Sequence, residues 1–184
     1  MLKDLVLKNR SVRKYQQDVP ISREMLVELV DLARHSASGS NRQGLKFMLS
    51  WEPEKNALIF RHIGLAGTPK EGERPSAYII ILGDTAITNQ YGVDPGIAAQ
   101  SMLLGATEKG LGGCMIGMIN RKGLHQALNI PERYEIVLVV SLGKPKESFV
   151  IETAAPGSTE TRGWWDEQGV RHVPKRSLDE LIIG

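Results

Sequence analysis

Apolar side chains recur at helical spacing in several stretches of the chain. The clearest is residues 23–35, where Met25, Leu26 and Leu29 begin a pattern of apolar positions three and four residues apart. Ser22 precedes this pattern as a plausible N-cap. We therefore predict a helix over residues 23–35. Further helices are expected over residues 2–9, from Asp94 to about Lys109 and from Arg121 to Leu128, with a short amphipathic turn over residues 177–182.

Short apolar runs rich in β-branched residues predict buried strands. The strongest are residues 77–82 and residues 135–142, and each ends at a glycine. Shorter strands are expected at residues 47–51, 57–60 and 114–116, whereas residues 61–75 and 146–176 lack periodicity and are expected to be irregular. No composition shift divides the chain. We expect one domain over residues 1–184, of the α+β or α/β class.

Length and charge exclude several classes of function. The 184 residues suit one domain, and a 41% hydrophobic content supports a packed core. Lys and Arg number 23 against 21 Asp and Glu, so the net charge of +2 argues against nucleic acid or an anionic membrane as a partner. No apolar run approaches the ~20 residues that a bilayer-spanning helix needs.

Cysteine and histidine usage argues against disulfides and metals. Cys114 is the single cysteine, which favours a reducing, cytoplasmic location. The four histidines show no ligand spacing with one another or with Cys114, so we expect no metal site. The chain also has no G-x-S-x-G elbow and no Walker A motif. Hydrolase and phosphoryl-transfer activities therefore lack residues to carry them.

Three local patterns have both a binding and a structural interpretation. Arg10, Ser11 and Arg13 place two guanidinium groups and a hydroxyl within four residues, which suits a phosphate but also a solvated basic turn. The loop over residues 36–43 offers amide donors and acceptors for a heterocycle, or is a plain turn. The glycines of residues 110–113 end a helix, and a flat ligand lying against them is the less favoured alternative.

Taken together and in order, these segments resemble the FMN-dependent nitroreductase family in its short form. The resemblance spans essentially the whole chain. It rests on the segments Arg10-Ser11-Val12-Arg13-Lys14-Tyr15, Ser38-Gly39-Ser40-Asn41-Arg42-Gln43, Gly96 to Leu104 with Gly110-Leu111-Gly112-Gly113, Leu142-Gly143-Lys144-Pro145 and Val173-Pro174-Lys175-Arg176-Ser177-Leu178. It implies an α+β sandwich with a mostly antiparallel central sheet flanked by helices, and an intertwined homodimer with two FMN molecules at the subunit interface.

The resemblance also implies which residues contact FMN. Arg10, Ser11 and Arg13 match the contacts at the phosphate end, and Arg176 and Lys175 match a second approach to the same phosphate. The loop that contacts the flavin, often from the partner subunit, is matched by Ser38, Ser40 and Asn41, with Gln43 nearby. Ile116 and Gly117 match the strand end whose backbone lies along the isoalloxazine near N5.

By this resemblance the protein is an NAD(P)H-dependent oxidoreductase. NADH or NADPH passes a hydride to flavin N5, and the reduced flavin then reduces a small-molecule acceptor such as a nitroaromatic or a quinone, with ping-pong kinetics. The alternative is an FMN-binding protein without nicotinamide turnover, a flavin sensor or a flavin-remodelling relative. Three positions depart from the family: Gly44-Leu45 replace a frequent Pro-Trp, and Gly117 falls where larger members have a glutamate.

Overall fold

Strand β5 (Tyr134–Pro145) is the central strand of a five-stranded sheet in the computed structural model, which describes residues 1–184. It pairs with β3 (Ala77–Asp84) on one side, and β3 pairs in turn with β2 (Leu45–Ser50). Strands β1 (Tyr15–Gln16) and β4 (Gly112–Ile116) also pair with β5. Every pairing in this sheet is antiparallel, which confirms the predicted α+β sandwich with an antiparallel sheet.

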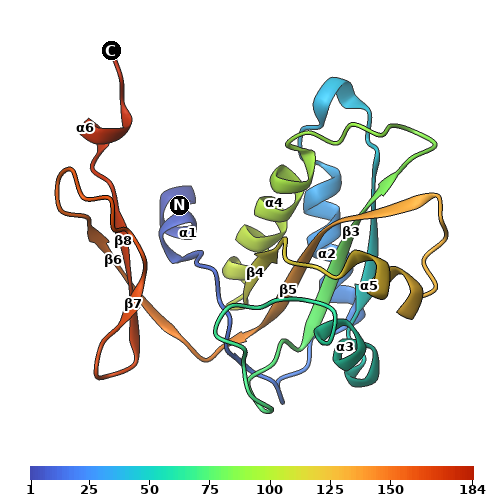
Figure 1. The fold of residues 1–184 in the computed structure, drawn as a ribbon, viewed down its shortest axis with the longest axis horizontal. Coiled ribbons are helices and arrows are strands. Elements are labelled where there is room, and N and C mark those ends of the chain that lie inside the picture. The colour runs from blue at the N-terminus through green and yellow to red at the C-terminus, as the bar shows by residue number, and fades with distance from the viewer. The chain divides into compact units, whose positions relative to one another are not determined.

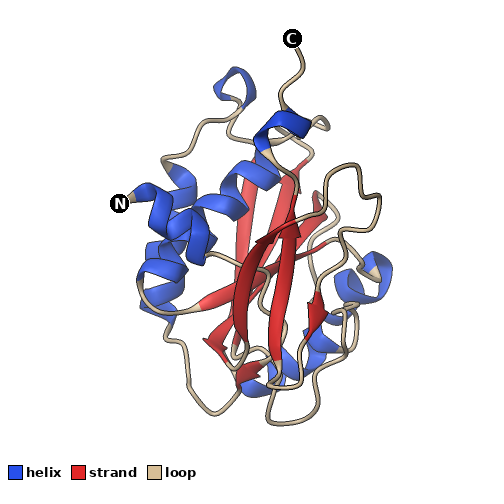
Figure 2. Ribbon diagram, turned by 90° about the vertical axis from the view of Figure 1, so that its left-hand side faces the viewer, coloured by secondary structure: helices blue, strands red, loops and turns tan.

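Helices cover both faces of this sheet. On one face α2 (Arg23–Arg34) packs against α4 (Asp94–Glu108), and α3 (Pro53–Phe60) and α5 (Arg121–Ala127) lie on the other (Figures 1 and 2). The short helix α1 (Leu2–Lys8) contacts α4. No helix combines the length and the apolar character that crossing a membrane requires.

The core between the sheet and the α2–α4 pair explains the strongest sequence patterns. Alternate residues of β3, Ile79 and Ile81, are fully buried there beside Leu29 of α2 and Met102 of α4. Ser22 caps α2 by accepting a hydrogen bond from the Met25 amide at 3.2 Å, as predicted. Burial on both faces of β3 accounts for its uninterrupted apolar run.

The chain divides into two compact units, residues 1–145 and residues 146–184. The second unit contains β6 (Ser148–Thr153), β7 (Trp164–Trp165), β8 (Val170–Lys175) and α6 (Leu178–Leu181). Strand β8 pairs in parallel with β6 and antiparallel with β7. Its strands are half-buried or exposed along their whole length, so no apolar alternation marks them.

Two sequence-based predictions are therefore wrong. Residues 57–60 are the last turn of α3 and not a strand, because Pro53 begins a helix there. Four consecutive apolar residues suit a buried strand and a buried helical turn equally well. Residues 146–176, predicted to be irregular, contain the three strands of the second unit.

Candidate functional site

The segment that carries Arg10, Ser11 and Arg13 is anchored to the start of β4. The Val12 amide donates to the Gly113 carbonyl at 3.0 Å, and Ser11 and Gly113 form a parallel bridge. Val12 is 3% exposed and fills the core side of this segment. The neighbouring Ser11 is exposed and Arg13 half-buried, which leaves both at the surface of the first unit.

Arg10 is held in a poorly solvated position. One terminal nitrogen, Nη2, donates to the Val6 carbonyl at the end of α1, whereas its Nε is buried and has no hydrogen-bond partner. Burial lowers the pKa of the Arg10 guanidinium, which means that its charged form is less stable there than in water. A bound anion would satisfy the free donor and restore the stability of the charge.

Close packing explains the glycines at the start of β4. A Cβ atom on Gly113 would lie 2.4 Å from the Ser141 carbonyl oxygen, and one on Gly112 would lie 2.6 Å from Cγ2 of Val12. The protein itself occupies this space, so these two glycines serve packing and not the approach of a flat ligand. Gly110, with φ of +72°, is the left-handed residue that ends α4, in agreement with the favoured interpretation.

The loop with Ser38, Ser40, Asn41 and Gln43 is exposed and strained. Ser40, Asn41 and Gln43 have positive φ values of 54°, 52° and 52°, a region that non-glycine residues seldom adopt. The loop is held by a hydrogen bond from the Gln43 amide to Ser38 Oγ at 3.2 Å and by one from Gln43 Nε2 to Asn41 Oδ1 at 3.1 Å. Strain of this kind concentrates at ligand-binding sites.

Helix α4 positions both of these segments. At its first turn, Asp94 Oδ1 accepts a hydrogen bond from the Gly39 amide at 2.9 Å. Farther along, Asn9 Nδ2 donates to the Leu103 carbonyl at 3.1 Å, which fixes the residue before Arg10. With a rise of about 1.5 Å per residue, the two anchor points lie roughly 14 Å apart along the helix.

The end of β4 borders an open, largely apolar pocket. Ile116 is 3% exposed, whereas Gly117 is exposed and a Cβ atom on it would meet no atom within 4 Å. Met118, 75% exposed, lines a pocket of about 680 Å³ together with Leu65 and Thr68. The Gly64 amide donates to the Met118 carbonyl at 2.8 Å and fixes the loop that forms the opposite wall.

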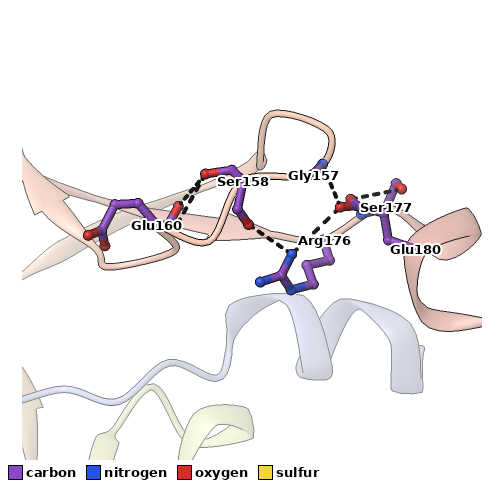
Figure 3. Close-up of polar contacts among 6 residues, drawn as sticks. All are labelled: Gly157, Ser158, Glu160, Arg176, Ser177 and Glu180. Atoms are coloured by element: carbon purple, nitrogen blue, oxygen red, sulfur yellow. Dashed lines mark hydrogen bonds and ion pairs between the residues drawn. The ribbon is translucent and has the colours of Figure 1, made fainter.

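Arg176 lies in the second unit, after β8, in a polar cluster (Figure 3). Its Nη1 donates to the Ser158 carbonyl at 2.9 Å and lies 3.6 Å from Glu180 Oε1. Glu180 also accepts hydrogen bonds from the Gly157 amide at 3.0 Å and from the Ser177 amide at 3.2 Å. These bonds, with the Gly157 amide first, lower the pKa of the Glu180 carboxyl.

Some of the predicted site residues thus lie on one segment of the structure, and the others lie on different segments. Arg10, Ser11, Arg13, Ile116 and Gly117 all lie on β4 or on the segment bound to it. The loop 38–43 lies at the start of α4. Lys175, the exposed last residue of β8, and Arg176 belong to the second unit.

Two residues that anchor the site segments to α4 could not be predicted from the sequence. Asn9 precedes Arg10, and Asp94 begins α4, but their partners at Leu103 and Gly39 are 94 and 55 positions away. No local pattern reveals contacts of this kind. An asparagine or an aspartate next to a helix end normally indicates only a cap.

The fold and the site define an antiparallel α+β sandwich protein with an arginine-bearing surface segment and a strained polar loop. A family model described as "Nitroreductase family" matches residues 6–73 and 85–144. The chain belongs to the nitroreductase family.

Three similar proteins illustrate the match. The chain is 28% identical over 180 residues to a "Putative NAD(P)H nitroreductase YodC" of Bacillus subtilis, over 76% of this chain and 87% of that protein. It is 25% identical over 170 residues to an "NADPH-flavin oxidoreductase" of Vibrio harveyi, over 83% and 69% of the two chains. The crystal structure of a nitroreductase family protein from Clostridium novyi NT superposes with a TM-score of 0.69 at 25% identity, over 79% of this chain and 86% of that chain.

Proposed function

We propose that this protein is an FMN-dependent NAD(P)H oxidoreductase that reduces a nitroaromatic, a quinone or a similar conjugated acceptor. The observation that carries the proposal is the buried, unpartnered Nε of Arg10 in the segment that the family uses for the FMN phosphate. Membership in the nitroreductase family supports it, as do the names of relatives that use NAD(P)H.

The residues present fit the phosphate end of FMN. Arg10 has a free donor in a desolvated position, and Arg13 and the exposed Ser11 hydroxyl lie on the same anchored segment. A flavin phosphate is close to a dianion, and charge-assisted hydrogen bonds from two guanidinium groups would neutralise it. We assign Lys175 and Arg176 to the same phosphate. Glu180 and the Ser158 carbonyl then orient Arg176.

The ring end of the flavin is assigned to the end of β4. Gly117, directly after Ile116, is exposed there, and no side chain blocks the space beside it. When bound, FMN would supply the redox chemistry, taking electrons from NAD(P)H and giving them to the acceptor. The chain's own role is to position the ring and to offer Met118 and Leu65 as apolar contacts for a flat acceptor. No side chain needs to act as an acid or a base.

We propose that two copies of the chain form the complete site. Within one chain the loop 38–43 and the anchor of Arg10 are held by opposite parts of α4. The loop is exposed, and its strain is maintained by hydrogen bonds at Ser38 and Asn41. We assign Ser38, Ser40, Asn41 and Gln43 to the flavin bound by the other copy of a homodimer.

Reconstitution and steady-state kinetics test this proposal. The purified protein should be yellow or take up FMN, and initial rates with NAD(P)H and a quinone should give the parallel double-reciprocal lines of a ping-pong reaction. A colourless protein that takes up no FMN contradicts the proposal. A yellow protein whose flavin is reduced by dithionite but by neither nicotinamide would be an FMN-binding protein without nicotinamide turnover.

A further inference from the structure

A second pocket lies on the α3 face of the sheet, next to the pocket at the end of β4, with which it shares Ala57, Phe60 and Arg74. It has a volume of about 430 Å³, within the range typical of small-molecule sites. Its lining comes from the loop after β1, from α3, from the loop before β3 and from β3 itself. Trp51 and Phe60 supply half-buried aromatic walls.

Tyr78 of β3 supplies a polar group to this pocket. The residue has no exposed surface, and its hydroxyl has no hydrogen-bond partner. Burial raises the pKa of the Tyr78 phenol well above its usual range, and the nearby charge of Arg74 opposes this only in part. The hydroxyl therefore stays protonated and is a donor that lacks an acceptor, which is a costly state for a buried polar group.

Arg74 supplies the positive charge. Its guanidinium lies over the Phe60 ring at 4.6 Å, and Nη1 pairs with Glu71 at 2.6 Å. The Nε of Arg74 is buried and has no hydrogen-bond partner. The Nη1 side of the guanidinium is thus paired with Glu71, and Nε is left as a donor for a ligand.

The polar wall around these two residues is rigid. Asn56 donates to the Ser76 carbonyl and accepts from Ser50 Oγ, each at 2.7 Å. Gln17 Oε1 accepts from the Arg74 amide at 3.0 Å, which fixes the loop that carries the guanidinium. Because these groups are already paired, Tyr78 and Arg74 are left as the donors that a ligand would find.

We propose that this pocket binds a small aromatic carboxylate, with its ring between Trp51 and Phe60 and its carboxylate on Tyr78 Oη and Arg74 Nε. Two unpartnered donors beside a cation select an anionic oxygen, and the aromatic walls select a flat ring. The carboxylates of Glu71 and Asp18 also line the pocket and oppose the binding of any anion, so a ligand with a single carboxylate is favoured over a dianion. Phe60 and Arg74 also line the pocket at the end of β4, whereas Tyr78 lines this pocket and not the other, so Tyr78→Phe distinguishes binding here from binding beside the flavin.

Calorimetric titration with benzoate tests the proposal, using benzyl alcohol as the neutral analogue. The protein is used as purified and saturated with whatever FMN it binds. We expect benzoate to bind and benzyl alcohol to bind at least about tenfold more weakly. Tyr78→Phe and Arg74→Gln should each weaken benzoate about tenfold, the scale of one lost hydrogen bond to a charged group.

Tyr91→Phe is the matched control, because Tyr91 also has a buried hydroxyl without a partner but does not line this pocket. It should leave benzoate affinity within about twofold of the parent. Tyr78→Phe removes only an unpaired hydroxyl and should fold normally, as a thermal melt will show. The proposal is overturned if benzoate does not bind, if Tyr78→Phe leaves its affinity unchanged, or if Tyr91→Phe weakens it equally.

Discussion

The Gly39 amide donates a hydrogen bond to Asp94 Oδ1 at 2.9 Å, and this bond ties the strained loop 38–43 to the first turn of α4. Removing the carboxylate should release the loop. We expect Asp94→Ala to weaken FMN binding about tenfold or less, since one hydrogen bond is lost, while Asp94→Asn retains an acceptor and most of the affinity. Fluorescence titration measures the FMN affinity of both variants. Equal affinity in the parent and in Asp94→Ala would mean that the loop does not contact the flavin.

Arg10 provides the sharpest test of the phosphate assignment. Arg10→Ala should weaken FMN about 10–100-fold, because one or two charge-assisted hydrogen bonds are lost, and should leave riboflavin, which has no phosphate, nearly unaffected. Arg23→Ala, at the exposed start of α2, is the control and should change neither affinity. A parallel loss of FMN and riboflavin binding in Arg10→Ala would place Arg10 elsewhere than at the phosphate.

The same added methyl group should destabilise the protein at Gly113 and have little effect at Gly117. Gly113→Ala would place Cβ 2.4 Å from the Ser141 carbonyl oxygen, and we expect it to lower the free energy of unfolding by about 2–3 kcal/mol. The added Cβ of Gly117→Ala meets no atom within 4 Å, and the free energy of unfolding should change by no more than about 0.5 kcal/mol. Urea unfolding measures the free energy of unfolding of the two variants. Similar stabilities would contradict the packing described for β4.

The regular core of the first unit could be predicted from the sequence, whereas the contacts of its site could not. Helix α2 shows its apolar period and its Ser22 cap locally, and β3 shows its burial as an apolar run. By contrast, Gly113 lies 101 positions from Val12 in the sequence, and nothing local shows that the two are hydrogen-bonded. The family resemblance predicts that the arginines of residues 10–13 contact a phosphate, but the burial of Arg10 Nε is visible only in the fold.

The strands of the second unit were missed for a different reason. Strand β8 contains a proline and several polar residues, and β7 is only two residues long. Such strands are stabilised by particular pairs of side chains, and not by the burial of one face of the sheet. The stacking of Trp164 on His172, with ring centroids 4.0 Å apart, is one of these pairs.

His172 should make the second unit sensitive to pH. Its Nδ1 lies 2.5 Å from Glu152 Oε1 and its Nε2 lies 3.2 Å from Asp166 Oδ2, and these two bonds, with Glu152 first, raise the pKa of His172 above its usual 6.5. A raised pKa in the folded state adds stability that is fully present below 6.5 and is lost as the pH rises through the raised value. The pKa of the Asp166 carboxyl is lowered, chiefly by the Val170 amide, so this carboxylate stays ionised below its usual 3.8.

Unfolding of the second unit, followed by tryptophan emission in a Trp51→Phe background, measures this effect. We expect urea resistance to fall as the pH rises above 6.5, and His172→Gln to remove that dependence. His35→Gln, at the exposed end of α2, is the control and should leave the pH dependence of urea resistance unchanged. A pH dependence that survives in His172→Gln would show that another group is responsible.

Anaerobic reduction of the FMN-loaded protein tests the central claim most directly. We expect NADH or NADPH to bleach the visible flavin band in a single turnover, much faster than it bleaches free FMN, and a quinone added afterwards to restore the band. Persistence of the band with both nicotinamides, in protein whose flavin dithionite reduces, would contradict it.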